Sequence, residues 1–137
     1  MITNNLGVIQ SFAEVRGINL IALGGQYSRK FNGFFGLVTE DALRSLRADI
    51  AFLSSSAIHG SAAFHQDQEV VHTKRLMMAA AARAYMLVDS GKFNKRALHF
   101  MADLKAFEAV LTSGPIAEDL QRDYRADGIN LKLAETI

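Results

Sequence analysis

The sequence predicts an α/β fold, a three-layer sandwich built on a mostly parallel sheet. The first observation behind this prediction is that the short apolar runs are continuous rather than alternating, which is typical of strands covered by helices on both faces. The second is that segments with helical spacing and capping residues lie between these runs, so that strands and helices alternate along the chain. Such units join through right-handed crossovers.

Five apolar runs are predicted to be strands. Each is four to six residues long and rich in aliphatic or aromatic side chains, which suits a buried strand better than a helix. They are Ile18–Leu23, Ile50–Leu53, Tyr85–Val88, Phe107–Leu111 and Ile129–Leu133.

Two helices are predicted in the first third of the chain. The first spans Leu6–Val15, and Gly17 can end it in a left-handed conformation. Thr39 is a favourable N-cap for the second, with Val38 and Leu43 placed to form a hydrophobic staple around the helix start.

Two further helices are predicted in the rest of the chain. Asp67 can cap a third helix that runs to about Ala82. A fourth begins with Pro115 in its first turn and ends before Gly128. One face of this fourth helix carries Ile116, Leu120 and Tyr124.

Length and composition indicate one globular domain over residues 1–137. Half of the residues are hydrophobic and 21% are charged, which excludes a disordered chain, and a net charge of +1 gives no global case for nucleic-acid binding. The absence of cysteine excludes a disulfide framework or a thiolate metal site and fits a reducing cytoplasm. No apolar run approaches the ~20 residues of a membrane span, and the first residues do not form a secretory signal.

Residues that follow the strands are the candidate site, because ligands of open α/β sheets bind beyond the carboxyl ends of the strands. Gly24 and Gly25 permit a close approach of the backbone to a ligand, or only a flexible connection. Ser54, Ser55 and Ser56 offer hydroxyl and N–H groups of the kind that a phosphate or sugar site needs, or form a polar loop that caps the next element.

Lys74 lies on the apolar face of the third predicted helix. Val70, Lys74, Met77 and Ala81 are spaced so that they share this face. A lysine in this position must extend to solvent, pair with a carboxylate or meet an anion.

The segment VDSGKF, Val88–Phe93, follows the third strand. Asp89 accepts hydrogen bonds, Ser90 donates and accepts them, and Lys92 supplies a mobile positive charge. These groups are expected at the carboxyl edge of the sheet, where they bind an anionic small molecule or form a simple turn with a solvated lysine.

No catalytic residue, metal site or cofactor is predicted. The four histidines lack the spacing of a zinc helix, and no nucleophile elbow, Walker loop or dinucleotide fingerprint is present. Asp89 and Glu69 are candidates for acid–base chemistry, but no second catalytic group is placed opposite either.

Seven short pieces in a fixed order carry a family resemblance. They are ITNN (2–5), ALGGQY (22–27), FFG (34–36), RADIAFLSSSAI (47–58), HTKRLMM (72–78), VDSGKF (88–93) and GINLKL (128–133). In these pieces the chain resembles the C-terminal effector-sensing domain of DeoR-type bacterial transcription repressors.

The resemblance implies a fold of the sugar-phosphate isomerase and CoA-transferase type. It also implies a phosphorylated sugar or sugar-like metabolite as ligand, control of an attached helix-turn-helix domain on operator DNA, a homodimer or homotetramer, and no enzymatic activity. The positions that match the family's motifs are Thr3, Asn4, Gly24, Gly25, Lys74, Asp89, Ser90, Lys92 and Phe93.

The chain also departs from the family's pattern. The helix-turn-helix domain, and a strand with a D-x-G-[ST]-T loop, are expected before this region, so we interpret the chain as an N-terminally shortened sensor that contacts DNA only through a missing domain. It has Ser54–Ser56 where the family usually has glycine, and Ser113 where it often has aspartate. The alternatives are a sugar-phosphate isomerase, with Asp89 and Lys92 as reactive groups, and an oligomerisation remnant that binds no ligand.

Overall fold

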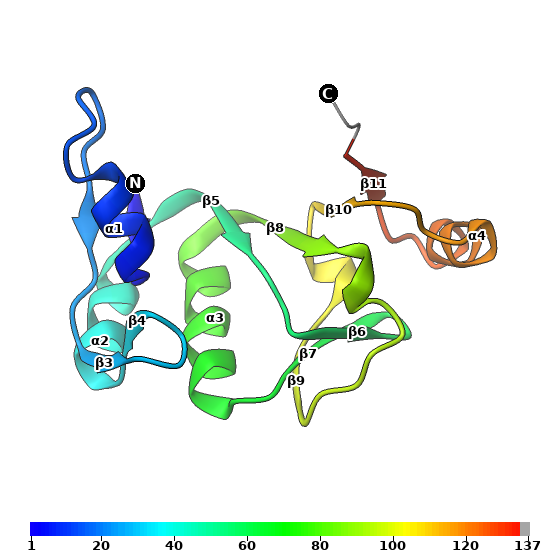
Figure 1. The fold of residues 1–137 in the computed structure, drawn as a ribbon, viewed down its shortest axis with the longest axis horizontal. Helices are drawn as coiled ribbons and strands as arrows, with labels where there is room; N and C mark the ends of the chain where they lie inside the picture. Colours follow the sequence, from blue (N-terminus) through cyan, green and yellow to red (C-terminus); the bar gives the residue numbers. More distant parts are fainter. Residues whose placement is uncertain (135–137) are drawn as a thin grey trace. The chain divides into compact units, whose positions relative to one another are not determined.

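The computed structural model describes residues 1–134. Contacts within the chain divide it into two compact units, Met1–Leu46 and Arg47–Ile137, and each is described by itself. Figure 1 shows the order of the helices and strands along the chain.

The first unit begins with a short parallel pair of strands joined through a helix. Strands β1 (Ile2–Thr3) and β2 (Ile21–Ala22) pair in parallel, and helix α1 (Leu6–Phe12) lies between them in the sequence. Asn5 caps α1 by accepting a hydrogen bond from the Val8 N–H at 3.0 Å. The predicted helix is therefore confirmed but ends earlier, and the predicted six-residue strand at 18–23 shrinks to β2. Gly17 has the predicted left-handed backbone, with φ of 84°, but it does not end the helix, whose C-cap is Ala13.

The first unit also contains a hairpin that the sequence interpretation missed. Strands β3 (Gln26–Ser28) and β4 (Gly33–Phe35) pair antiparallel in the segment expected to be a flexible connection. The Tyr27 and Phe34 rings, in register across the hairpin, lie 5.5 Å apart between centroids. This cross-strand aromatic contact stabilises a pairing that glycine-rich composition alone does not indicate.

Helix α2 (Leu37–Ser45) corrects the predicted start of the second helix. Its N-cap is Gly36, and Thr39 lies inside the helix, fully buried. The Thr39 hydroxyl donates to the Gly24 carbonyl at 2.6 Å, so it is engaged in tertiary packing instead of capping. The predicted hydrophobic staple is also wrong, because Val38 is 67% exposed.

The second unit is organised around a parallel four-stranded sheet. The strands lie in the order β11–β10–β8–β5, with bounds Leu131–Leu133, Ala109–Ser113, Ala81–Asp89 and Ala48–Leu53. All three pairings are parallel. The predicted parallel sheet is thus confirmed, although its last two strands begin two residues later than expected.

Helix α3 (Gln68–Ala80) is the element that the sequence predicted best. The Asp67 side chain accepts hydrogen bonds from the N–H groups of Glu69 and Val70, as expected of an N-cap. Strand β8 starts directly at Ala81, so Ala81 caps the helix rather than extending its apolar face.

Helix α4 (Glu118–Ala126) begins later than predicted. Its N-cap is Ala117, so Pro115 precedes the helix and does not occupy its first turn. Gly128, with φ of 77°, follows the helix as expected. Ile116 and Tyr124 are buried, but Ile116 contributes from the segment before the helix.

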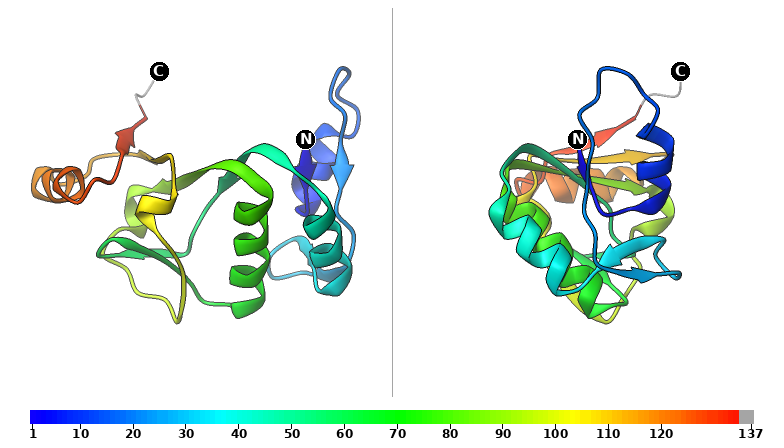
Figure 2. Two further views of the ribbon diagram at one scale, coloured as in Figure 1. Left: turned by 180° about the vertical axis from the view of Figure 1, so that it is seen from behind. Right: turned by 90° about the vertical axis from the view of Figure 1, so that its left-hand side faces the viewer.

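A smaller antiparallel sheet accompanies the parallel one in the second unit. Its order is β6 (Ala57–His59), β7 (Ala62–His65) and β9 (His99–Asp103). Figures 1 and 2 show this sheet and α3 on the same side of the parallel strands. The shared core includes Ile58, Val71, Met86, Met101 and Val110.

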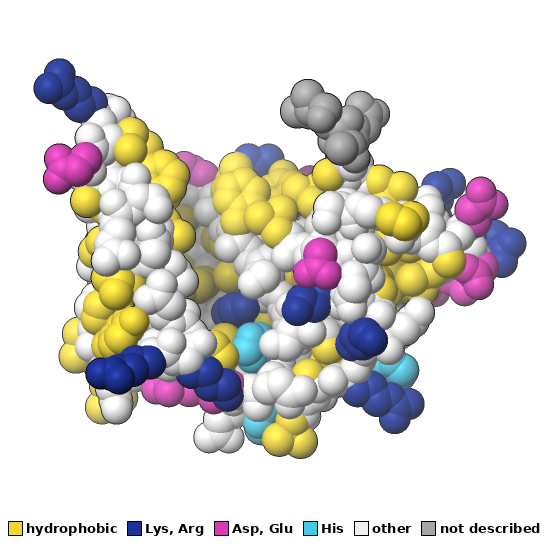
Figure 3. Space-filling model, viewed as in Figure 1, with side chains coloured by type: hydrophobic (Ala, Val, Ile, Leu, Met, Phe, Trp, Pro, Cys, Tyr) yellow, Lys and Arg dark blue, Asp and Glu magenta, His cyan; other side chains and the backbone are white. Residues whose placement is uncertain are grey.

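The two faces of the parallel sheet differ in burial. In β8, Ala84, Met86 and Val88 face the core, whereas alternate residues such as Leu87 are exposed. Phe52 of β5 is 61% exposed, and Figure 3 shows hydrophobic side chains gathered over β5 and β8. The sequence predicted that the strands are buried on both faces, and this prediction is wrong for β5 and β8. The mixed α/β architecture, with helices flanking a parallel sheet, is confirmed and is consistent with a three-layer sandwich.

Candidate functional site

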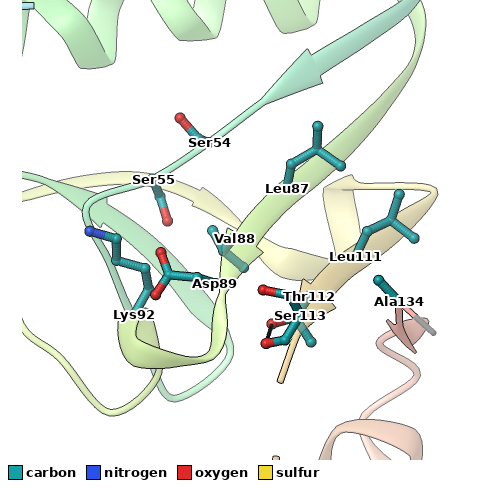
Figure 4. Close-up of a pocket in the computed structure, with 10 residues that line it drawn as sticks. All are labelled: Ser54, Ser55, Leu87, Val88, Asp89, Lys92, Leu111, Thr112, Ser113 and Ala134. Carbon is teal, nitrogen blue, oxygen red and sulfur yellow. Dashed lines mark hydrogen bonds between the residues drawn. The ribbon is translucent and has the colours of Figure 1, made fainter. Parts of the chain in front are cut away.

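A pocket of about 510 Å³ lies at the carboxyl edge of the parallel sheet. Each of the four strands contributes residues at or just beyond its carboxyl end, so the pocket lies where open α/β sheets bind ligands. The lining residues are Ser54, Ser55, Leu87, Val88, Asp89, Lys92, Leu111, Thr112, Ser113 and Ala134 (Figure 4).

The turn after β8 carries the pocket's charged side chains. Residues Ser90–Lys92 form the 3-10 helix η1, which is capped by Asp89 through a 3.0 Å hydrogen bond from the Gly91 N–H. The Phe93 N–H closes the turn on the Ser90 carbonyl at 3.3 Å. These backbone contacts fix the positions from which the Asp89 and Lys92 side chains extend.

Lys92 and Asp89 border the same open space. Figure 4 shows the Lys92 side chain, the Asp89 carboxylate and the Ser55 hydroxyl around one part of the pocket, with Leu87 and Leu111 to one side. Within residues 1–134, no hydrogen bond or ion pair engages the Lys92 ammonium. A cation, a carboxylate and several hydroxyls beside an apolar wall suit a ligand that carries both negative charge and hydroxyl groups.

The serine loop after β5 is ordered by contacts of its own. Ser55 is buried and its hydroxyl donates to the Ala57 carbonyl at 3.3 Å, while the Ser56 N–H donates to the Phe64 carbonyl at 3.1 Å. Ser54 and Ser55, both predicted as site residues, line the pocket. Ser56 does not.

Lys74 reaches this loop from α3. Its ammonium donates to the Ser54 carbonyl at 2.6 Å and to the Ser54 hydroxyl at 3.3 Å. Burial lowers the pKa of Lys74 to about 8 from its usual 10.5, because the charged form loses hydration. Lys74 is not among the residues that line the pocket, so it supports the wall formed by Ser54.

The lowered pKa of Lys74 predicts a specific pH dependence of stability. Between pH 8 and 10.5 the unfolded chain binds this proton and the folded chain does not, so the free energy of unfolding should rise with pH in that window. The measurement is urea unfolding of wild type and Lys74→Met across this pH range. The free energy of unfolding of the wild type should rise by up to about 3 kcal/mol more than that of the variant. If the free energies of unfolding of the two proteins changed with pH in parallel, the lowered pKa of Lys74 would be contradicted.

Six of the residues that line the pocket were not predicted as site residues: Leu87, Val88, Leu111, Thr112, Ser113 and Ala134. Thr112 is almost fully buried, Ser113 stands beside Asp89 in the strand register, and Ala134 follows β11. In the sequence, Ser113 stands out only as a departure from the family pattern. Thr112 and Ser113 directly follow the predicted strand at 107–111, so the carboxyl-edge rule could have indicated both.

Ser90 and the four predicted residues of the first unit do not line this pocket. The Asn4 amide donates to the Phe34 carbonyl at 2.8 Å, and the Thr3 hydroxyl accepts from the Asn5 N–H at 3.1 Å. A Cβ at Gly25 would lie 2.5 Å from the Phe35 carbonyl oxygen, whereas one at Gly24 would meet no atom within 4 Å. Thr3, Asn4 and Gly25 thus have packing roles inside their own unit, and a ligand role for them stays a prediction.

The described residues offer no obvious metal centre. No group of three or more His, Asp or Glu side chains in residues 1–134 could hold an ion. His65 and His99 are neighbours across the β7–β9 pair, but a third ligand is not placed beside them. In the same residues, no helix is long and apolar enough to cross a membrane.

Comparison with known proteins identifies the family. The sequence profile of the DeoR C-terminal sensor domain matches residues 1–114, which include β5, η1 and the end of β10. The chain belongs to the DeoR C-terminal sensor domain family. The strands and turns that form most of the pocket wall are therefore those of a DeoR-type sensor domain.

Curated relatives of this DeoR-type domain are transcriptional regulators. The L-fucose operon activator of Haemophilus influenzae is 31% identical over 123 residues, covering 89% of this chain and 49% of the relative. The HTH-type transcriptional regulator IolR of Bacillus subtilis is 27% identical, covering 98% and 54%. The glycerol-3-phosphate regulon repressor of Escherichia coli K12 is 28% identical, covering 84% and 46%. The chain spans about half the length of these relatives.

Proposed function

We propose that the chain is the effector-sensing part of a DeoR-type transcriptional regulator and binds a phosphorylated sugar or related metabolite. The observation that supports this most is the pocket at the carboxyl edge, where Lys92 and Asp89 stand among hydroxyl groups. The family profile extends across both compact units, which supports assigning them to one sensing domain.

The proposed binding mode assigns a separate task to each side of the pocket. The Lys92 ammonium attracts the phosphate through charge-assisted hydrogen bonds. Asp89 accepts hydrogen bonds from sugar hydroxyls, the Ser55 hydroxyl, which donates to the Ala57 carbonyl, accepts another, and Ser113 donates or accepts. The apolar surface of Leu87 and Leu111 packs against the carbon skeleton of the ligand.

We propose that ligand binding in the pocket changes how another part of the regulator binds DNA. Two of the named relatives are an operon activator and a regulon repressor, and a third is described as HTH-type. Because a ligand shifts an equilibrium only by its difference in affinity for two states, the pocket must differ between a DNA-binding and a released form. We propose a homodimer or homotetramer as the working assembly.

A thermal-shift panel tests the proposed ligand class. A phosphorylated sugar at 100 times its dissociation constant should stabilise the folded chain by about 2.7 kcal/mol, and the unphosphorylated sugar should have much less effect. No shift with any pentose, hexose or triose phosphate at millimolar concentration would contradict the proposal. Turnover of a sugar phosphate, lost in Lys92→Ala, would instead support an isomerase.

A further inference from the structure

The last helix contributes one buried side chain to the core, and the partly buried Leu120 packs against that core. Helix α4 is largely polar, and Tyr124 is its only fully buried residue in the described chain, with 4% of its surface exposed. This helix lies beyond residue 114, where the match to the family profile ends.

Tyr124 makes two contacts with segments far away in the sequence. Its hydroxyl donates to the Gly60 carbonyl, in the turn between β6 and β7, at 2.8 Å. Its ring packs against Phe93 with 6.0 Å between centroids and an interplanar angle of 43°. Burial of the hydroxyl raises the pKa of Tyr124 to about 12, consistent with a neutral donor.

Phe93 connects this contact to the pocket. It follows Lys92 directly, its N–H closes η1 on Ser90, and only 6% of its surface is exposed. It also forms an isolated β-bridge with Ile58 of β6. Phe93 is thus held beside β6 through its backbone and against Tyr124 through its ring, and the backbone that carries Lys92 is held with it.

We propose that Tyr124 is a positioning residue for the pocket and holds Lys92 in place through Phe93. The ring packing performs this task, and the hydroxyl bond to Gly60 serves mainly to attach α4. The consequence for ligand binding rests on the proposed function, whereas the consequence for Lys92 itself does not. A smaller aliphatic side chain at 124 leaves space beside Phe93, so the turn and Lys92 become free to move.

The first experiment measures the surroundings of Lys92 without any ligand. Lysines of the full chain are labelled by reductive 13C-methylation, and the Lys92 signal is assigned with Lys92→Arg. Tyr124→Leu should shift or broaden the Lys92 signal, whereas Tyr124→Phe, which keeps the ring, should leave it in place. The Lys105 signal, from a turn that does not line the pocket, serves as the internal control.

A second variant keeps this test decisive if Tyr124→Leu folds poorly. Phe93→Leu removes the other ring of the pair and should produce the same change at Lys92. An unchanged Lys92 signal in every variant that remains folded would overturn the proposal. So would equal changes at Lys92 and Lys105, because those would indicate a general loss of structure.

The second experiment measures affinity for inorganic phosphate, the simplest probe of a cation at this site. Tyr124→Leu should bind phosphate several-fold more weakly than wild type, and Tyr124→Phe should stay within twofold. Equal affinity in all three proteins would contradict positioning. If wild type itself binds neither phosphate nor sugar phosphates, the proposed function fails, and the Lys92 signal still decides the role of Tyr124.

Discussion

The Lys92→Ala variant is expected to bind phosphorylated sugars about 10- to 100-fold more weakly than wild type. Lys92 is the cation that lines the described pocket, and nothing in residues 1–134 neutralises it by hydrogen bond or ion pair. A charge-assisted hydrogen bond contributes about 1.5–3 kcal/mol, which sets the size of the loss. Isothermal titration calorimetry with wild type and variant measures it, and the unphosphorylated sugar should bind both proteins alike.

A turn elsewhere in the chain provides a matched control for this variant. The 3-10 helix η2 (Leu104–Ala106) has the same plan as η1: an Asp103 cap that accepts from a backbone N–H, and a phenylalanine that closes the turn. Its Lys105 does not line the pocket. Lys105→Ala should therefore leave sugar-phosphate affinity unchanged. If both variants lost the same affinity for sugar phosphates, the effect of Lys92 would be explained by the net charge of the protein alone.

The Gly25→Ala variant is expected to lose about 2–4 kcal/mol of unfolding free energy. Gly25 has φ of 144°, a conformation that side chains rarely adopt, and an added Cβ would lie 2.5 Å from the Phe35 carbonyl oxygen and closer still to the Thr39 hydroxyl. Backbone strain and steric overlap therefore act together. Urea unfolding followed by circular dichroism measures the loss.

The neighbouring Gly24→Ala variant is the control, because a Cβ there meets no atom within 4 Å. It should change the free energy of unfolding by less than about 1 kcal/mol. If both variants were equally stable and both lost affinity for sugar phosphates, the glycine pair would be a ligand contact. A large loss of stability in Gly25→Ala alone assigns that glycine to packing within the first unit.

Elements with strong local signals could be predicted from the sequence. Asp67 before an amphipathic run fixed the start of α3, and continuous apolar runs indicated the parallel strands β5 and β8. The carboxyl-edge rule then led to Ser54, Ser55, Asp89 and Lys92, which the structure brings together in one pocket. Their binding role remains a proposal.

The failures arose where tertiary contacts override local preference. Thr39 is a favourable cap by residue type, yet its hydroxyl bonds to the Gly24 carbonyl, and Gly36 starts the helix instead. The sequence of a turn also does not show whether the turn belongs to a ligand site. DSGKF (89–93) and DLKAF (103–107) form similar turns, but only the first borders the pocket. What separates them is their place at the sheet edge, which depends on strand order.

The most direct test of the central claim is a nuclear magnetic resonance titration of the chain with the sugar phosphate that gives the largest thermal shift. We expect one set of amide signals to move together and saturate with one dissociation constant, those of Ser54, Ser55, Asp89, Gly91 and Lys92. Those of η2 around Lys105 should remain unchanged. Saturable shifts confined to other residues, with the signals at the carboxyl edge unmoved, would contradict it.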